Sequence, residues 1–345
     1  MKTRKITAII LSVIVCVGLM LSGCGKESGT GGKNNQEASG GKDPSKVWVL
    51  RVDDNDVYLN EVNAFALSFM EGLGVEADTD MTAYYSESYP TLDDAFKAQL
   101  LVQIRQVKIL YNKAVERGLS LTSEEEAKVD ELVTSFFEKH DSAEMMDKYG
   151  IDHDLIVKIY TEMQLIKQLE SVIEEEAGFE ETDYGTFYDF VFLTIEIDEN
   201  GNGVLDASGN YVELSQEEKD AQKLLAEEVL ARLQQGDDPQ SLIDEYKLSA
   251  TSGILHATSD SLKETYGLKD GETSDIINNS FGYTIVQIVT LVDKDYTEQV
   301  NTYSESTTKS NAVDNQENEW YNSYNFSEDD LDNEVWSKFT FQDFV

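Results

Sequence analysis

Few side chains in this sequence are of the types that do chemistry, and their spacing matches no common catalytic pattern. The three histidines, His140, His153 and His256, are scattered along 345 residues without the His-Glu-x-x-His spacing of zinc proteases. The sequence also lacks the Gly-x-Ser-x-Gly motif of serine hydrolases and a glycine-rich phosphate loop. The histidines are therefore interpreted as surface or capping residues, and no cofactor is expected.

A loop rich in Asp, Asn and Gly offers a candidate calcium site. Ligand-type side chains occupy positions 1, 3, 5 and 9 of an EF-hand-like pattern: Asp198, Asn200, Asn202 and Asp206. Position 12, which normally supplies a bidentate Glu, is Gly209. Because the missing carboxylate is the one that closes such a site, the favoured alternative is a β-hairpin that turns at 200–201 and 208–209, with no metal.

The composition limits the function classes. The chain contains 67 Asp and Glu against 27 Lys and Arg, which gives a net charge of −40. A phosphate backbone requires the opposite field, so the composition excludes a nucleic-acid partner. The hydrophobic fraction of 40% and the aromatic fraction of 10% are sufficient for two modest folded domains. Two cysteines exclude a disulfide framework.

The first 24 residues have the pattern of an export signal. A basic start, residues 2–5, precedes an apolar run, residues 6–21, that contains no acidic residue. The ending Leu21-Ser22-Gly23-Cys24 resembles the bacterial lipoprotein signal, in which Cys24 is acylated and becomes the mature N-terminus. The alternative is an uncut membrane anchor, although the run is shorter than a span of ~20 residues. We expect residues 1–23 to be removed and the lipid on Cys24 to anchor the protein in the cell membrane, on its extracytoplasmic face.

Behind the signal, residues 24–46 are rich in Gly, Ser, Asn and Lys and are expected to form a flexible tether. Two short strands around a turn are then expected at 47–59. Apolar residues recur every three or four positions over 95–117 and 154–176, which predicts two amphipathic helices. Between them, a capping box that starts at Ser123 predicts the beginning of another helix.

The pattern changes near Thr186. Residues 187–197 are β-branched and aromatic and predict a buried strand, and residues 283–292 predict a last strand. A capping box at 215–218 opens a helix between these strands, so this part of the chain predicts an α+β module. The polar C-terminal segment carries spaced aromatic residues that should pack back on the N-terminal helices; they include Trp320, Tyr324 and Trp336.

Several segments resemble the SurA/PrsA-type extracytoplasmic foldases. Residues 110–119 (LYNKAVERGL) and the acidic capping box after them resemble the helical N-terminal domain of that family. Residues 271–274 (GETS) are similar to the Gly-Glu-x-Ser of its parvulin-type, or PpiC-like, prolyl isomerase domain. Residues 281–286 (FGYTIV) are similar to its Gly-Tyr-His-Ile-Ile.

The resemblance implies an α+β fold in two domains. A helical, SurA-like chaperone domain would comprise residues 47–180 and 296–345, and a parvulin-like domain, residues 181–295, would be inserted into it. In this family the helical part holds unfolded chains, so the implied partners are unfolded or newly exported polypeptides. The implied function is protein folding during secretion, by a membrane-tethered foldase or chaperone.

The sequence departs from the family at the isomerase site. Parvulin sites place one His on the first strand and one on the last, on either side of the substrate proline. Phe192 and Thr284 are matched to these two positions, and the nearest candidate for a substitute is His256. The resemblance therefore implies a degenerate site and a chaperone without rotamase activity. Two alternatives are an active parvulin-family peptidyl-prolyl isomerase and a solute- or wall-binding lipoprotein.

A client-binding surface is predicted in the helical domain, because chaperones need exposed apolar area and aromatic or Met side chains adapt to varied clients. The candidates share helical spacing or aromatic character: Phe65, Phe69, Met70, Tyr84, Tyr85 and Tyr89. The alternative is ordinary core, because most apolar side chains at helical spacing are buried.

Overall fold

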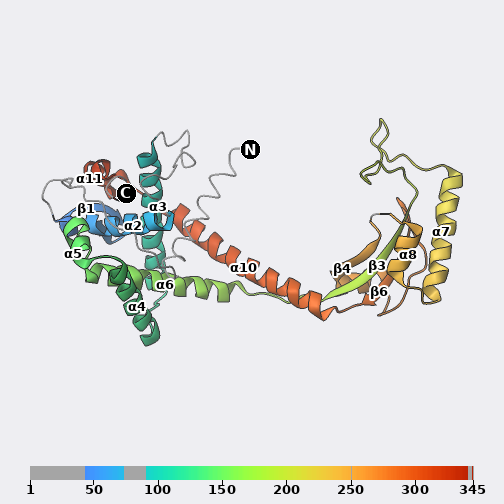
Figure 1. Cartoon of the computed structure of the whole chain (residues 1–345), viewed down its shortest axis with the longest axis horizontal. Helices are drawn as coiled ribbons and strands as arrows, with labels where there is room; N and C mark the ends of the chain where they lie inside the picture. Colours follow the sequence, from blue (N-terminus) through green and yellow to red (C-terminus); the bar gives the residue numbers. More distant parts are fainter. Residues whose placement is uncertain (1–42, 74–90, 250, 341–343, 345) are drawn as a thin grey trace. The chain divides into compact units, whose positions relative to one another are not determined.

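The structure is a computed structural model that describes residues 43–73, 91–249, 251–340 and 344 (Figure 1). Contacts within the chain divide it into two compact units. Unit 1 comprises the residues up to Ala177 and those from Lys309 onward, and unit 2 is Gly178–Thr308. The sequence had placed these boundaries at 180/181 and 295/296. The second boundary differs because one continuous helix runs through it. The signal, Cys24 and the tether lie outside the described residues.

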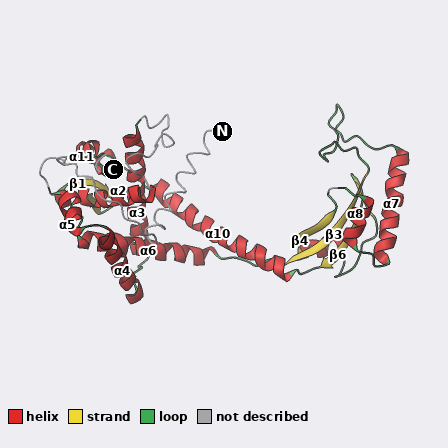
Figure 2. Ribbon diagram, viewed as in Figure 1, coloured by secondary structure: helices red, strands yellow, loops and turns green. Residues whose placement is uncertain are grey.

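Unit 1 is mainly helical (Figure 2). Within the described residues, a strand pair is followed by four long helices, and the C-terminal part of the chain adds the end of one further helix and short turns. In chain order the elements are η2 (Pro44–Lys46), β1 (Trp48–Val52), β2 (Asn55–Tyr58), α2 (Leu59–Leu73), α3 (Leu92–Glu116), α4 (Ser123–Lys139), α5 (Ser142–Glu144), η4 (Met145–Tyr149), α6 (His153–Ala177), η5 (Glu328–Asp330) and α11 (Asn333–Lys338).

The helix starts in unit 1 follow from local hydrogen bonding. Thr91 caps α3 by accepting a hydrogen bond from the backbone N–H of Asp94. Thr122 and Glu125 form the capping box of α4, one residue earlier than the sequence had placed it. Gly118 adopts a φ of 73° just after α3, a conformation that glycine reaches without a Cβ penalty.

The C-terminal segment completes the core of unit 1. Leu331 forms a bridge with Leu50 of β1, and the N–H of Asp332 donates to the carbonyl of Val49 at 2.8 Å. Trp336 stacks on Phe339 at 5.5 Å between ring centroids. As the sequence led us to expect, the C-terminal aromatic residues pack against the core of the N-terminal helices: Trp320, Tyr321, Tyr324, Phe326, Trp336 and Phe339.

The helix α10 (Lys294–Ser323) belongs to both units and was not expected from the sequence. It contains neither Gly nor Pro, so nothing in its backbone opposes a helix. Its only fully buried residue among those described is Glu317. The apolar stripe that reveals most helices in a sequence is therefore absent.

Unit 2 is a four-stranded antiparallel sheet with three helices of its own and the first half of α10. The strand order is β4-β3-β6-β5, so β3 and β6 are central. Its elements are β3 (Tyr184–Leu193), α7 (Gln216–Gln234), α8 (Pro239–Tyr246), β4 (Gly253–Thr258), α9 (Ser259–Tyr266), β5 (Ile277–Asn279) and β6 (Gly282–Thr290). Together, the two units make the chain an α+β protein, as predicted.

The sheet of unit 2 has two differently covered faces. Phe190, Phe192 and Ile285 lie on the face that packs against α7 and α8. Phe187, Val286 and Ile288 form a second core cluster with Leu262 of α9, on the opposite face. Because side chains alternate along a strand, neighbouring residues of β3 belong to different faces.

Candidate functional site

The register between β3 and β6 decides which residues can form an isomerase-like pair. Val191 lies opposite Thr284, whereas Phe192 lies opposite Tyr283. Directly paired residues share a face, so Val191 is the residue that faces Thr284. Phe192 is 1% exposed in the cluster under α7 and α8. The matching of Phe192 with Thr284 as one pair is therefore wrong, because the two side chains lie on opposite faces. The pair that faces one another still contains no histidine.

His256 lies away from that pair. It is on β4 opposite Thr186, five residues along β3 from Val191, which corresponds to about 16 Å along a strand. Its Nδ1 is 2.9 Å from Thr186 Oγ1, and the Thr186 hydroxyl donates to Asp293 at 2.6 Å. Its ring stacks on Tyr296 at 3.7 Å. His256 thus stabilises the start of α10 and does not replace a histidine at the pair.

The other two histidines lie at helix ends of unit 1. His140 is the C-cap residue of α4, and its ring packs at 4.6 Å on Phe136. His153 is the first residue of α6 and stacks on Phe137 at 6.0 Å. Within the described residues, no group of three or more His, Cys, Asp and Glu side chains is placed to hold a metal ion.

Polar groups do surround Val191 and Thr284. The Ser252 hydroxyl accepts from the N–H of Val191 at 2.9 Å, and the Ser274 hydroxyl accepts from the N–H of Val286 at 2.9 Å. Each of these hydroxyls accepts a hydrogen bond from a strand backbone and therefore stabilises the sheet. Thr284 itself is only 9% exposed.

Asp189 is the titratable residue at this face that sequence reasoning missed. It lies two residues before Val191 on the same face of β3, and one of its carboxylate oxygens is buried without a hydrogen-bond partner among the described residues. Burial raises its pKa to about 6. Burial, and then the charge of Asp189, raises the pKa of Tyr266. An acidic residue inside an otherwise apolar strand, FYDFVFL, was the signal in the sequence.

The candidate calcium residues belong to two separate turns. Asp198 accepts from the N–H groups of Asn200 and Asn202 at 2.9 and 2.8 Å. Asp206 accepts in the same way from Ser208 and Asn210 at 2.7 and 3.0 Å. Both carboxylates therefore organise their own turns, which is the hairpin alternative that the sequence favoured.

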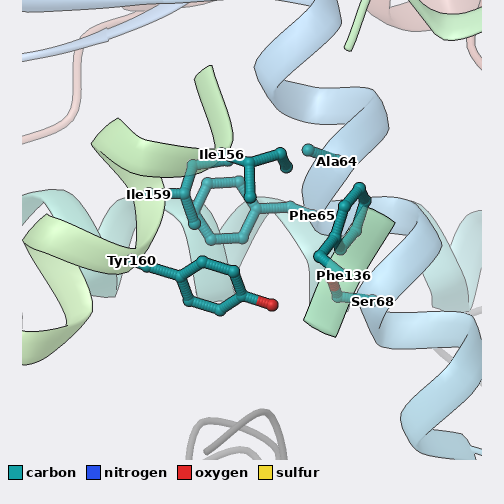
Figure 3. Close-up of a pocket in the computed structure, with 7 residues that line it drawn as sticks. All are labelled: Ala64, Phe65, Ser68, Phe136, Ile156, Ile159 and Tyr160. Carbon is teal, nitrogen blue, oxygen red and sulfur yellow. The ribbon is translucent and has the colours of Figure 1, made fainter. Parts of the chain in front are cut away.

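The predicted client-binding residues of α2 are in the core. Phe65, Phe69 and Met70 are 1%, 8% and 4% exposed, so an exposed lining at these positions is wrong and ordinary core describes them. Their helical spacing buries them against neighbouring helices. Figure 3 shows Phe65 in a small cavity of unit 1, lined by Ala64, Phe65, Ser68, Phe136, Ile156, Ile159 and Tyr160. Tyr84, Tyr85 and Tyr89 lie outside the described residues.

Unit 1 has a larger surface hollow that sequence reasoning missed. It has a volume of about 540 Å³ and lies between the second half of α4 and the start of α6. Its lining combines aromatic, aliphatic and Met side chains with a few polar ones: Val133, Thr134, Phe137, Glu138, Ser142, Met146, Ile151, Asp152 and His153. Met146 is 47% exposed there. These residues come from α4, α5, η4, α6 and the loop before α6, so no single periodic pattern marks them in the sequence.

The chain is similar to solved structures of PrsA proteins and of a SurA-like chaperone. The prolyl isomerase PrsA of Bacillus cereus matches with 14% identity over 85% of this chain and 96% of its own, at a TM-score of 0.29. One of two SurA-like chaperones of Campylobacter jejuni matches with 9% identity over 81% and 98%, at 0.29. PrsA of Bacillus subtilis matches with 15% identity over 86% and 99%, at 0.22.

Comparison with protein-family models gives no match, and comparison with curated proteins gives none either. Among the helices that the structure describes, none is both long enough and apolar enough to cross a bilayer.

Proposed function

We propose that the protein is a membrane-tethered, extracytoplasmic chaperone that binds unfolded exported polypeptides and does not turn over prolyl bonds. The observation that supports the lack of turnover is the facing pair on β3 and β6, which is Val191 and Thr284. Rotation about a peptide bond has a barrier of ~18–20 kcal/mol, and a catalyst must stabilise the twisted bond. An aliphatic side chain and a nearly buried hydroxyl supply neither of the imidazoles that parvulin sites use.

Polypeptide binding is supported by exposed apolar surface in both units. The hollow of unit 1 presents Met146 and Phe137, and flexible or aromatic side chains of this kind accommodate varied partners. Large apolar side chains of unit 2 are also exposed, among them Leu205, Tyr211 and Phe281. Contiguous exposed apolar patches mark interaction sites in otherwise polar proteins.

Tethering is proposed from the sequence of the first 24 residues. The lipid on Cys24, followed by a segment rich in Gly and Ser, would hold the folded part near the membrane on its outer face. One acyl-bearing residue binds membranes reversibly if it carries a single chain and stably if it carries more. The location is therefore tied directly to the modification of Cys24.

The test measures the suppression of aggregation and the rate of prolyl isomerisation with the same protein preparation. The purified protein should suppress the aggregation of an unfolded test protein, while a prolyl-peptide isomerisation assay stays at the uncatalysed rate. Met146→Glu should reduce the suppression, because it places a charge in the hollow. Val115→Glu is the matched control, because Val115 is 50% exposed on α3 and does not line the hollow. Strong isomerase turnover without any effect on aggregation would contradict the proposal.

An active isomerase is the second candidate, and Asp189 is the observation that favours it. A carboxyl with a pKa raised to about 6 keeps its proton in mildly acidic solution and can then donate a hydrogen bond. Asp189 shares a face with Val191 and Thr284. If this carboxyl acts, turnover should be present below pH 6 and fall as the pH rises through that value.

A further inference from the structure

The segment that connects β3 to α7, residues 194–214, carries large apolar side chains that are about half exposed. We call it the double-turn segment; it projects from the end of the sheet as a long excursion (Figure 1). Ile197, Leu205 and Tyr211 are 49%, 55% and 46% exposed. Phe281, from the turn between β5 and β6, is 44% exposed beside them. The core of unit 2 does not require any of these side chains to be apolar.

The double-turn segment is a built structure. Its two Asx turns repeat after eight residues, with Asp198 and Asp206 at equivalent positions. Its three arms are joined in a ring: the N–H of Glu196 donates to the carbonyl of Val212, Val212 to Val204, and Val204 to Glu196, at 2.8–2.9 Å. A surface held in this way loses little conformational freedom when a partner binds.

The exposed side chains form one continuous surface. Leu205 and Tyr211 are paired across a bridge, so their side chains lie on the same side. The Tyr211 ring lies over Gly203, where an added Cβ would be 2.4 Å from the ring. Tyr211 also meets Phe281 edge to face at 5.4 Å between ring centroids. The N–H of Thr194 donates to the carbonyl of Phe281 at 2.8 Å, which fixes the two parts together.

The charged residues of the double-turn segment itself are all acidic. Residues 194–214 contain no Lys, Arg or His. They contain five acidic residues: Glu196, Asp198, Glu199, Asp206 and Glu213. Only the last of these has a lysine partner, Lys219, in the described residues. An apolar patch inside a negative field attracts partners that combine apolar and basic side chains.

We propose that the double-turn segment and Phe281 form a docking surface for extended polypeptides in which aromatic or large aliphatic side chains are flanked by Lys or Arg. The proposal rests on the proposed function and names where unit 2 holds a client and which clients it prefers. Anionic lipid headgroups are the wrong partner, because five carboxylates would repel them. A second copy of this chain is also disfavoured, because it would bring the same acidic surface against itself.

The test uses two labelled peptides of about 15 residues with the same central Leu and Tyr residues, flanked in one by Lys and in the other by Glu. Their binding to the purified protein is followed by fluorescence anisotropy. The double variant Leu205→Ser/Tyr211→Ser removes the apolar surface. Leu224→Ser is the matched control, because Leu224 is 66% exposed on α7, outside the surface.

The Lys-flanked peptide should bind more tightly than the Glu-flanked one, and added salt should reduce the difference. The double variant should weaken its binding about tenfold or more, and the control should leave it unchanged. Glu196→Gln/Glu199→Gln replaces only exposed charges and should weaken the binding of the Lys-flanked peptide without changing that of the Glu-flanked peptide. This variant keeps the test valid if the double variant does not fold, which circular dichroism would reveal.

Two results would overturn the docking surface and leave the chaperone function standing. The first is equal binding by the wild type and a folded double variant, together with intact suppression of aggregation. The second is a dimer in sedimentation that the double variant abolishes, because the surface would then bind a second copy. Failure of the wild type to bind either peptide or to suppress aggregation would contradict the proposed function itself.

Discussion

Glu317 is expected to make the stability of unit 1 depend on pH near neutrality. Its side chain lies in the core at 4% exposure, on the part of α10 that belongs to unit 1. It accepts a hydrogen bond from the Gln106 side chain of α3 at 3.3 Å. Burial, and then the charges of Glu170 on α6 and of Asp314, raises its pKa to about 7. Folding therefore favours the protonated form.

The size of the effect follows from the shift. A rise from 4.5 to about 7 corresponds to up to about 3 kcal/mol, at 1.36 kcal/mol per unit. The folded state binds the proton more tightly than the unfolded state. The stability contribution is therefore complete below pH 4.5 and is lost as the pH rises to about 7. Glu317→Gln resembles the protonated acid at every pH, so the variant should match the wild type at pH 4.5 and be up to about 3 kcal/mol more stable at pH 8.

The assay can isolate unit 1, because all three tryptophans of the sequence, Trp48, Trp320 and Trp336, belong to it. Urea unfolding followed by tryptophan fluorescence between pH 4.5 and 8.5 gives the difference in unfolding free energy at each pH. Glu319→Gln is the control, because Glu319 is exposed on the same helix. A constant difference between the Glu317→Gln variant and the wild type across this range would refute the reasoning.

Three further predictions test other parts of the chain. Lys108→Met should lower the unfolding free energy of unit 1 by about 3–5 kcal/mol in urea unfolding. Lys108 is 0% exposed between Glu61 and Glu162, and its loss leaves these buried carboxylates without their main partner. The control Lys128→Met, at an exposed ion pair, should lower the unfolding free energy by no more than about 1 kcal/mol. Gly282→Ala should unfold unit 2, because an added Cβ would be 2.0 Å from the Phe192 carbonyl oxygen at a φ of 144°. The control Gly236→Ala has open space around its Cβ, so only its φ of 91° should lower the stability, by about 1 kcal/mol. Calorimetry measures both effects. Labelled fatty acid should be incorporated into the wild type and lost in Cys24→Ser, and equal labelling would exclude Cys24 as the site.

The sequence predicted the helices that have an apolar stripe. The helix expected at 154–176 is α6, His153–Ala177, and its buried residues recur at the predicted spacing. The capping box at Ser215 also begins α7 as expected, with the Glu218 side chain accepting from the N–H of Ser215. In these helices the capping residues and the buried apolar residues both favour the same helix, so the sequence alone is sufficient to predict it.

The features that the sequence did not predict have a common physical cause, because each of them depends on contacts with residues far away in the chain. The alternation in β3 shows that Val191 and Phe192 point to opposite faces, but only the register with β6 shows which of them faces Thr284. The strand β4 and the helix α9 were not predicted either, because Gly253–Thr258 is a short edge strand with largely exposed residues. The burial of Asp189 likewise depends on α9 and β6, which the local sequence does not specify.

The sheet face that carries Val191 and Thr284 and the proposed docking surface lie at the same end of the sheet. β3 ends at Leu193 opposite Gly282, and the bond from Thr194 to Phe281 follows directly. Val191 is two residues before that end, or about 7 Å along the strand. A client held on the double-turn segment should therefore lie near Val191 and Thr284. Adding the Lys-flanked peptide should shift the amide NMR signals of these two residues and leave that of His256, farther along the sheet, unchanged. Shifts at His256 without shifts at Thr284 would place the client on another part of unit 2.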